Sequence, residues 1–83
     1  MKFKAEINIM PLKSLLDPQG KAVTASMGNI GIEEIKNVRI GKHITLEIDA
    51  ENENIAKEKV TESCVKLLAN QIMESFEFTL EKV

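Results

Sequence analysis

The chain has 83 residues, 43% hydrophobic and 29% charged, with a formal net charge of −2 at pH 7. This length predicts one small domain, residues 1–83, because so short a chain buries only about 60–65% of its unfolded surface. The near-neutral charge, without basic clusters between aromatic residues, excludes a nucleic-acid partner, and no apolar run reaches the roughly 18–20 residues of a membrane span.

The N-terminal stretch KFKAEINI, residues 2–9, alternates polar and apolar side chains, which predicts a half-buried strand. Pro11 cannot donate a ladder hydrogen bond, so the strand should end there. An alternating stretch also differs from the continuous apolar core of a signal peptide. We therefore expect a cytoplasmic protein without membrane attachment.

The stretch LDPQGKAV, residues 16–23, predicts the start of a helix. Asp17 can cap free N–H groups, and Pro18 suits the first helical position. An apolar stripe then recurs at helical spacing, and a glycine that can end the helix follows it. These positions are Val23, Met27, Ile30 and Gly31.

Gly20 lies in the first turn of this predicted helix, where glycine costs up to about 1 kcal/mol relative to alanine. Such a cost is understandable where a missing side chain lets another backbone approach. We interpret Gly20 as part of a docking surface.

From residue 35 the apolar period returns to two. Val38 and Ile40 share one face of a predicted strand, and Ile44, Leu46 and Ile48 share one face of the next. A tight turn at Gly41-Lys42 would join two strands as a hairpin. The alternative is one long strand with a bulge at Gly41.

A second amphipathic helix is predicted after Asn52 or Asn54, either of which can cap it. Its apolar positions are Ala56, Val60, Cys64, Leu67 and Leu68. Asn70 suits the exit from this helix, and residues 76–80 alternate again as a last strand.

The predicted order is β-α-β-β-α-β, an α+β chain with the ferredoxin-like arrangement of an antiparallel sheet and two helices on one face. The open face of that sheet would be polar and suited to a wet interface with another chain. Its predicted residues are Lys4, Glu6, Asn8, Arg39, His43, Thr45, Glu47, Glu77 and Thr79.

No catalytic or metal-binding set emerges from the residues. His43 and Cys64 are the only histidine and cysteine, so we expect neither a disulfide nor a metal site. Gly41-Lys42 lacks the surrounding pattern of a phosphate loop. Arg39 is predicted to point to the open sheet face, where it could pair with a partner chain.

Three segments together resemble the PurS family: LDPQGKAV, VRIGK (residues 38–42) and KLLAN (residues 66–70). PurS is the small subunit of three-part phosphoribosylformylglycinamidine (FGAM) synthase in purine biosynthesis. The resemblance implies a dimer or tetramer that bridges a glutaminase subunit and a synthetase subunit and assists ammonia transfer. It implies no cofactor in this chain, since ATP and Mg are used by the synthetase when it converts FGAR, glutamine and ATP to FGAM, glutamate, ADP and phosphate.

We hypothesise that contacts with partner chains are made by Asp17, Pro18, Gln19, Gly20, Arg39, Gly41 and Lys42. An ACT-like regulatory and dimerisation module and an assembly protein of an unrelated complex are alternatives. An acylphosphatase-like enzyme is disfavoured, because the loop MPLKSLLD after the first strand has no arginine or glycine to cradle phosphate.

Overall fold

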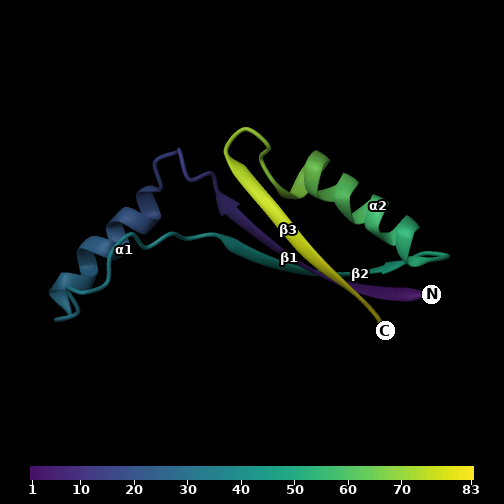
Figure 1. The fold of residues 1–83 in the computed structure, drawn as a ribbon, viewed down its shortest axis with the longest axis horizontal. Helices are drawn as coiled ribbons and strands as arrows, with labels where there is room; N and C mark the ends of the chain where they lie inside the picture. Colours follow the sequence, from purple (N-terminus) through teal and green to yellow (C-terminus); the bar gives the residue numbers. More distant parts are fainter.

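A computed structural model describes residues 1–83, in which one antiparallel sheet and two helices form. Strand β1 is the centre of the sheet, whose order is β2-β1-β3 (Figure 1). The elements along the chain are β1 (Lys2–Pro11), α1 (Pro18–Asn29), β2 (Lys42–Asp49), α2 (Glu53–Ser63), the π-helical turn η1 (Cys64–Leu68) and β3 (Glu74–Lys82). The predicted α+β class, with an antiparallel sheet and two helices, is confirmed.

The core lies between one face of the sheet and α2. Alternate residues of β1 are buried, and α2 and η1 bury three small or medium side chains against them. The buried set is Phe3, Ala5, Ile7, Ile9, Ala56, Val60, Cys64 and Ala69. The alternation of β1 is therefore explained by a single covered face.

The other face of the sheet is polar, as predicted. In the register, Lys4 lies between Glu47 and Glu81, and Asn8 lies between His43 and Glu77. The Nδ1 atom of His43 is 2.7 Å from the Oδ1 atom of Asn8. Cross-strand pairs of this kind let the polar side chains of this face interact with one another.

The predicted strand through Val38 and Ile40 is wrong, and so is the hairpin at Gly41-Lys42. Residues 35–41 form no ladder, and the chain enters β2 at Lys42 without a left-handed glycine at position 41. The Val38 N–H donates to the side chain of Thr24 within α1, and the Ile40 N–H donates to the side chain of Asp17 at the N-cap. Since those donors are occupied, a fourth strand does not form.

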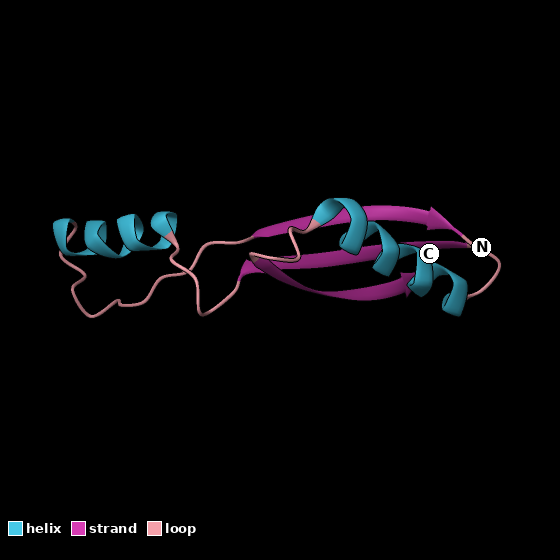
Figure 2. Ribbon diagram, turned by 90° about the horizontal axis from the view of Figure 1, so that it is seen from above, coloured by secondary structure: helices cyan, strands magenta, loops and turns pink.

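The predicted placement of both helices on one face is also wrong. Helix α1 lies beyond the end of the sheet, while α2 alone covers the face (Figures 1 and 2). The molecule measures 51 × 26 × 14 Å as a result. We call residues 12–41, with α1 at their centre, the lobe. Its apolar stripe is small and ends at Ile30, which is 67% exposed.

The predicted ends of α1 are confirmed. Asp17 is its N-cap, Pro18 is its first residue, and it ends at Asn29 with Ile30 as C-cap. Gly31 follows with φ of 83°, the left-handed conformation in which glycine carries no steric penalty.

Helix α2 begins at the first of the two predicted caps, because the side chain of Asn52 accepts from the Ile55 N–H at 2.9 Å. Its end differs from the prediction. Ala69 N–H bonds the Cys64 carbonyl across the wider π turn, which shifts the residues that face the core. Leu67, predicted to be inward, is 81% exposed. Neither helix is long and apolar enough to cross a bilayer.

Candidate functional site

The residues predicted to contact partner chains lie where the lobe meets the sheet, and we call this set the junction. It consists of Asp17, Pro18, Gln19, Gly20, Arg39, Gly41 and Lys42. Asp17 lies at its centre. One oxygen of the Asp17 carboxylate accepts from Gly20 N–H at 3.0 Å, and the other accepts from Ile40 N–H at 3.0 Å. These two bonds favour the charged form and hold the pKa of Asp17 below its ordinary value. A single carboxylate thus ties the start of α1 to the returning chain.

Thr24 makes a second tie between the same two segments. Its hydroxyl donates to the Gly20 carbonyl at 2.7 Å and accepts from Val38 N–H at 3.0 Å. Thr24 was not predicted as a contact residue, because the hydroxyl of a threonine inside a helix commonly bonds a carbonyl one turn earlier. Its second partner lies 14 residues away, and no local pattern marks it.

Gly20 is the only buried residue of α1, and its missing side chain has a clear structural reason. A Cβ at this position would lie under 3.0 Å from the Val38 carbonyl oxygen and the Asp17 carboxylate. The backbone that approaches Gly20 is the chain's own, whereas its predicted place in a docking surface stays a prediction. Gly41 has a similar reason, because a Cβ there would overlap the Ile9 carbonyl oxygen.

Arg39 and Lys42 connect the junction to the strands. The Arg39 guanidinium donates to the Pro11 carbonyl at the end of β1, so its predicted position on the open sheet face is wrong. Lys42 Nζ is 3.8 Å from a Glu74 carboxylate oxygen at the start of β3. The other Glu74 oxygen accepts from Asn70 N–H at 2.8 Å.

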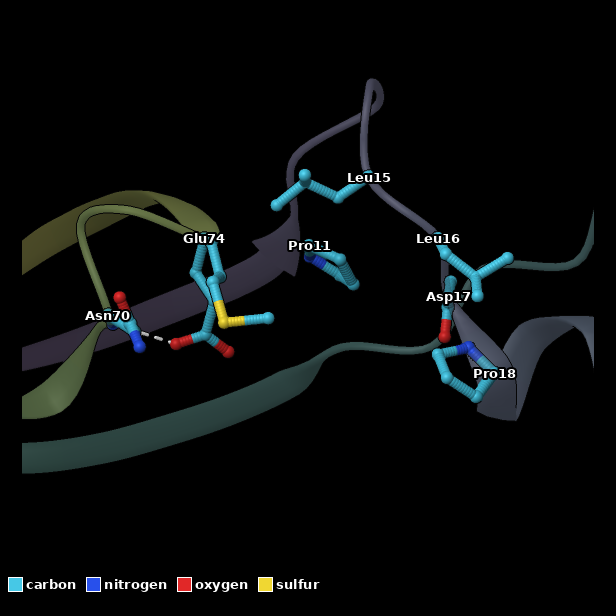
Figure 3. Close-up of a pocket in the computed structure, with 8 residues that line it drawn as sticks. Pro11, Leu15, Leu16, Asp17, Pro18, Asn70 and Glu74 are labelled. Carbon is cyan, nitrogen blue, oxygen red and sulfur yellow. Dashed lines mark hydrogen bonds between the residues drawn. The ribbon is translucent and has the colours of Figure 1, made fainter.

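A hollow of about 300 Å³ opens beside these contacts (Figure 3). Its walls come from the end of β1, the connector into α1 and the turn before β3. Leu15 and Leu16 are exposed there, and the carboxylate of Glu74 lies on the opposite wall. The full lining is Pro11, Leu15, Leu16, Asp17, Pro18, Asn70, Met73 and Glu74.

The structure therefore joins Asp17 to Gly20 within the first turn of α1 and to Ile40 on the returning chain, while Arg39, next to Ile40, bonds Pro11. The charge of Arg39 also helps to lower the pKa of Asp17. Pro18, Gln19, Gly41 and Lys42 lie around these bonds with exposed surface. Whether these residues contact a partner stays a prediction.

The residues with reactive side chains lie elsewhere. His43 is on the open sheet face, with Nε2 3.8 Å from a Glu6 carboxylate oxygen. Cys64 is fully buried under α2, and burial raises the pKa of its thiol, which makes it a core residue. No three His, Cys, Asp or Glu side chains gather as metal ligands would.

Comparison with known proteins gives one consistent family. The PurS family profile, described as phosphoribosylformylglycinamidine (FGAM) synthase, matches residues 4–82. The PurS subunit of FGAM synthase from Methanocaldococcus jannaschii is 35% identical over 81 residues, covering 98% of each chain. The Bacillus subtilis subunit is also 35% identical over 81 residues, covering 98% of this chain and 95% of its own.

Solved structures agree with this result. Bacillus subtilis PurS superposes with a TM-score of 0.87 at 34% identity, covering 96% of this chain and 99% of its own. A chain in the structure of PurLQS from Thermotoga maritima superposes with a TM-score of 0.88 at 31% identity, covering 96% of this chain and 98% of its own. The detached α1 and the three-stranded sheet thus occur within a fold already seen in relatives.

Proposed function

The chain belongs to the PurS family and is a subunit of FGAM synthase in purine biosynthesis, and we propose that it is the non-catalytic bridge of that complex. In this proposal it joins the glutaminase subunit to the ATP-dependent synthetase subunit and assists the transfer of ammonia between them. The observation that carries the proposal is the family match over residues 4–82.

Two structural features support a bridging role. His43 lies on the open sheet face beside Asn8 and Glu6, whereas Cys64 is buried in the core, and in this proposal the chain contributes surface and shape. The molecule is also elongated, 51 Å in its longest dimension, with a lobe at one end and a sheet at the other. An elongated chain can contact two partners at separate places.

Ammonia transfer gives the bridge a physical purpose. Free ammonia is protonated in water at neutral pH and then loses its nucleophilic lone pair. An enclosed route that excludes water keeps it reactive between the site of release and the site of use. In our proposal this chain completes such an enclosure and holds no cofactor, while ATP and Mg bind to the synthetase subunit.

The finer features of the proposal follow from the family and the surface. We place the complex in the cytoplasm and this chain in it as a dimer or tetramer. The partner contacts are assigned to the junction, through Asp17, Pro18, Gln19, Gly20, Arg39, Gly41 and Lys42. The ACT-like alternative depended on a β-α-β-β-α-β order, and the observed β-α-β-α-β order removes its basis.

Reconstitution with the two partner subunits from the same organism tests this function. FGAM formation is measured with glutamine, and separately with ammonium chloride, in the presence and absence of this chain. The expected result is that omitting the chain abolishes the glutamine-dependent rate and leaves the ammonia-dependent rate. Equal glutamine-dependent rates with and without the chain would contradict the bridging role.

The residue assignment has its own test. Gln19→Ala and Lys42→Ala remove exposed side chains at the junction, while Lys57→Ala removes an exposed lysine on α2. The first two are expected to weaken assembly, measured by sedimentation of the reconstituted complex, and the third is not. Wild-type assembly by both junction variants would reject the assignment.

A further inference from the structure

A second, larger hollow lies on the lobe and has a different character. It has a volume of about 550 Å³ and is open to solvent. Three segments form it: the connector that leads into α1, one side of α1 itself, and the chain that returns toward β2. We call it the basic groove and define it by its cations Lys13, Lys21 and Arg39 and its apolar residues Leu15, Leu16 and Val38.

The basic groove is positive because its three cations outnumber its one carboxylate, which stays charged. Asp17 is the only carboxylate in the lining, and each of its oxygens accepts a backbone N–H. The three cations come from three separate segments, so they are spread along the hollow. Lys13 and Lys21 are exposed, whereas Arg39 is half-buried by its bond to the Pro11 carbonyl.

The chemistry of the groove favours a peptide over a single phosphate group. Phosphate is typically held by free backbone N–H groups at a helix start, but here the Asp17 carboxylate already accepts from Gly20 and Ile40 N–H. What the groove offers instead is spaced side-chain cations above apolar surface from Leu15, Leu16 and Val38. An extended segment with acidic and apolar side chains complements both features.

We propose that the basic groove binds an acidic, partly apolar peptide segment of another FGAM synthase subunit. The inference rests on the proposed bridging function and deepens it. It adds Lys13 and Lys21 to the contact surface and states the chemistry of the partner. Charge complementarity of this kind speeds encounter and selects the correct partner.

The test compares two doubly charge-reversed full-length variants. Lys13→Glu with Lys21→Glu reverses the groove and leaves Arg39 and the junction bonds in place. Lys57→Glu with Lys59→Glu reverses two exposed lysines on α2 and is the matched control. Binding of each labelled chain to the partner subunits is titrated by fluorescence anisotropy at low and high salt.

The groove variant is expected to bind about tenfold more weakly at low salt and to lose most of its salt dependence, because exposed charges act mainly at low ionic strength. The control is expected to stay within about twofold of wild type. Equal affinities for all three chains would overturn the groove proposal while leaving the bridging function intact. Absence of binding by the wild-type chain would instead contradict the bridging function.

A photo-crosslinking amino acid at position 25, on the groove wall, identifies the occupant by mass spectrometry. A crosslink to an acidic segment of a partner subunit supports the proposal, and a crosslink only to basic or neutral segments contradicts it. Inorganic phosphate is the second probe. Saturable phosphate binding to the isolated wild-type chain, lost in the groove variant, would reassign the groove as a small-anion site.

Discussion

At the scale of single residues, the lobe is held by a few polar contacts around a glycine. Asp17 and Thr24 each bond both the first turn of α1 and the returning chain at Val38–Ile40. Gly20 lets the two segments approach closely enough for those bonds. The glycine that weakens the helix in isolation is therefore required by the contact that holds the helix in place.

Replacing Gly20 with alanine is expected to destabilise the lobe. The new Cβ would lie under 3.0 Å from the Val38 carbonyl oxygen, and overpacking costs about 1–3 kcal/mol, whereas the gain in helix propensity is at most about 1 kcal/mol. Hydrogen exchange of the α1 amides measures the effect as faster exchange. Gly28→Ala is the control, because the nearest atom to its Cβ is Glu33 Cγ at 3.9 Å, and it should slow exchange. Slower exchange in both variants would disprove the steric argument.

The stability of the lobe is expected to depend on pH through the Asp17 carboxylate. Its pKa in the folded chain is lowered by the bonds from Gly20 and Ile40, so its contribution is complete above the ordinary aspartate value and is lost as pH falls through the folded value. The expected loss therefore lies below about pH 4. The amide shifts of Gly20 and Ile40, followed by NMR, should titrate together in that range. In Asp17→Asn they should not titrate, and an unchanged titration would show that another group is responsible.

At the scale of elements, the two helices play different parts. Helix α2 provides the core, since it covers the apolar face of all three strands. Helix α1 is displaced from that core and is tied to residues 38–40. The π turn η1 ends α2 and decides which of its last apolar residues point inward. Helical spacing alone would place both Cys64 and Leu67 inside, but only Cys64 is buried.

Replacing Val60 or Leu67 with alanine tests how much each side chain contributes to the free energy of unfolding. Val60 is 1% exposed, so Val60→Ala should reduce the free energy of unfolding by about 2 kcal/mol through lost burial and a cavity. Leu67 is the larger side chain but lies outside, so Leu67→Ala should change the free energy of unfolding by less than about 0.5 kcal/mol. Urea unfolding followed by circular dichroism measures both. A large loss for Leu67→Ala would mean that the helix continues without the π turn.

At the scale of the whole molecule, a small core is combined with a long surface. Only nine residues are buried, and all but Gly20 lie at the sheet end, leaving the lobe with polar ties and exposed apolar side chains. Both chain ends lie at the far end of the sheet from α1 (Figure 1). The lobe is therefore free to enter an interface without displacing the termini.

Binding of the partner subunits is expected to stabilise the lobe more than the sheet. A partner that binds only the folded lobe adds about 2.7 kcal/mol of stability at a concentration one hundred times its Kd. Hydrogen exchange in the complex should therefore slow chiefly in residues 13–39. Protection that appears only in β2 and β3 would place the interface on the sheet instead.

Local sequence patterns were sufficient to predict most of the helices and strands. The strand of residues 2–11, the Asp17 and Asn52 caps and the end of α1 before Gly31 depend on contacts within a few residues, so alternation and capping chemistry predicted them. The segments around Asp17 and Arg39 were both predicted as partner contacts, but their contact with each other was not predicted. Their resemblance to PurS gave the family.

Tertiary contacts settled what those patterns left open. Val38 and Ile40 alternate like strand residues, yet their N–H groups bond Thr24 and Asp17, which are 14 and 23 residues away. Because these N–H groups bond distant side chains, residues 38–40 do not form a fourth strand, and α1 lies beyond the end of the sheet. Arg39 lies between Val38 and Ile40 in this segment, and its guanidinium donates to the Pro11 carbonyl instead of pointing to the open sheet face. Alternation and helical spacing indicate which side chains share a face, whereas the partner of a backbone donor depends on which distant segment lies beside it in the folded chain.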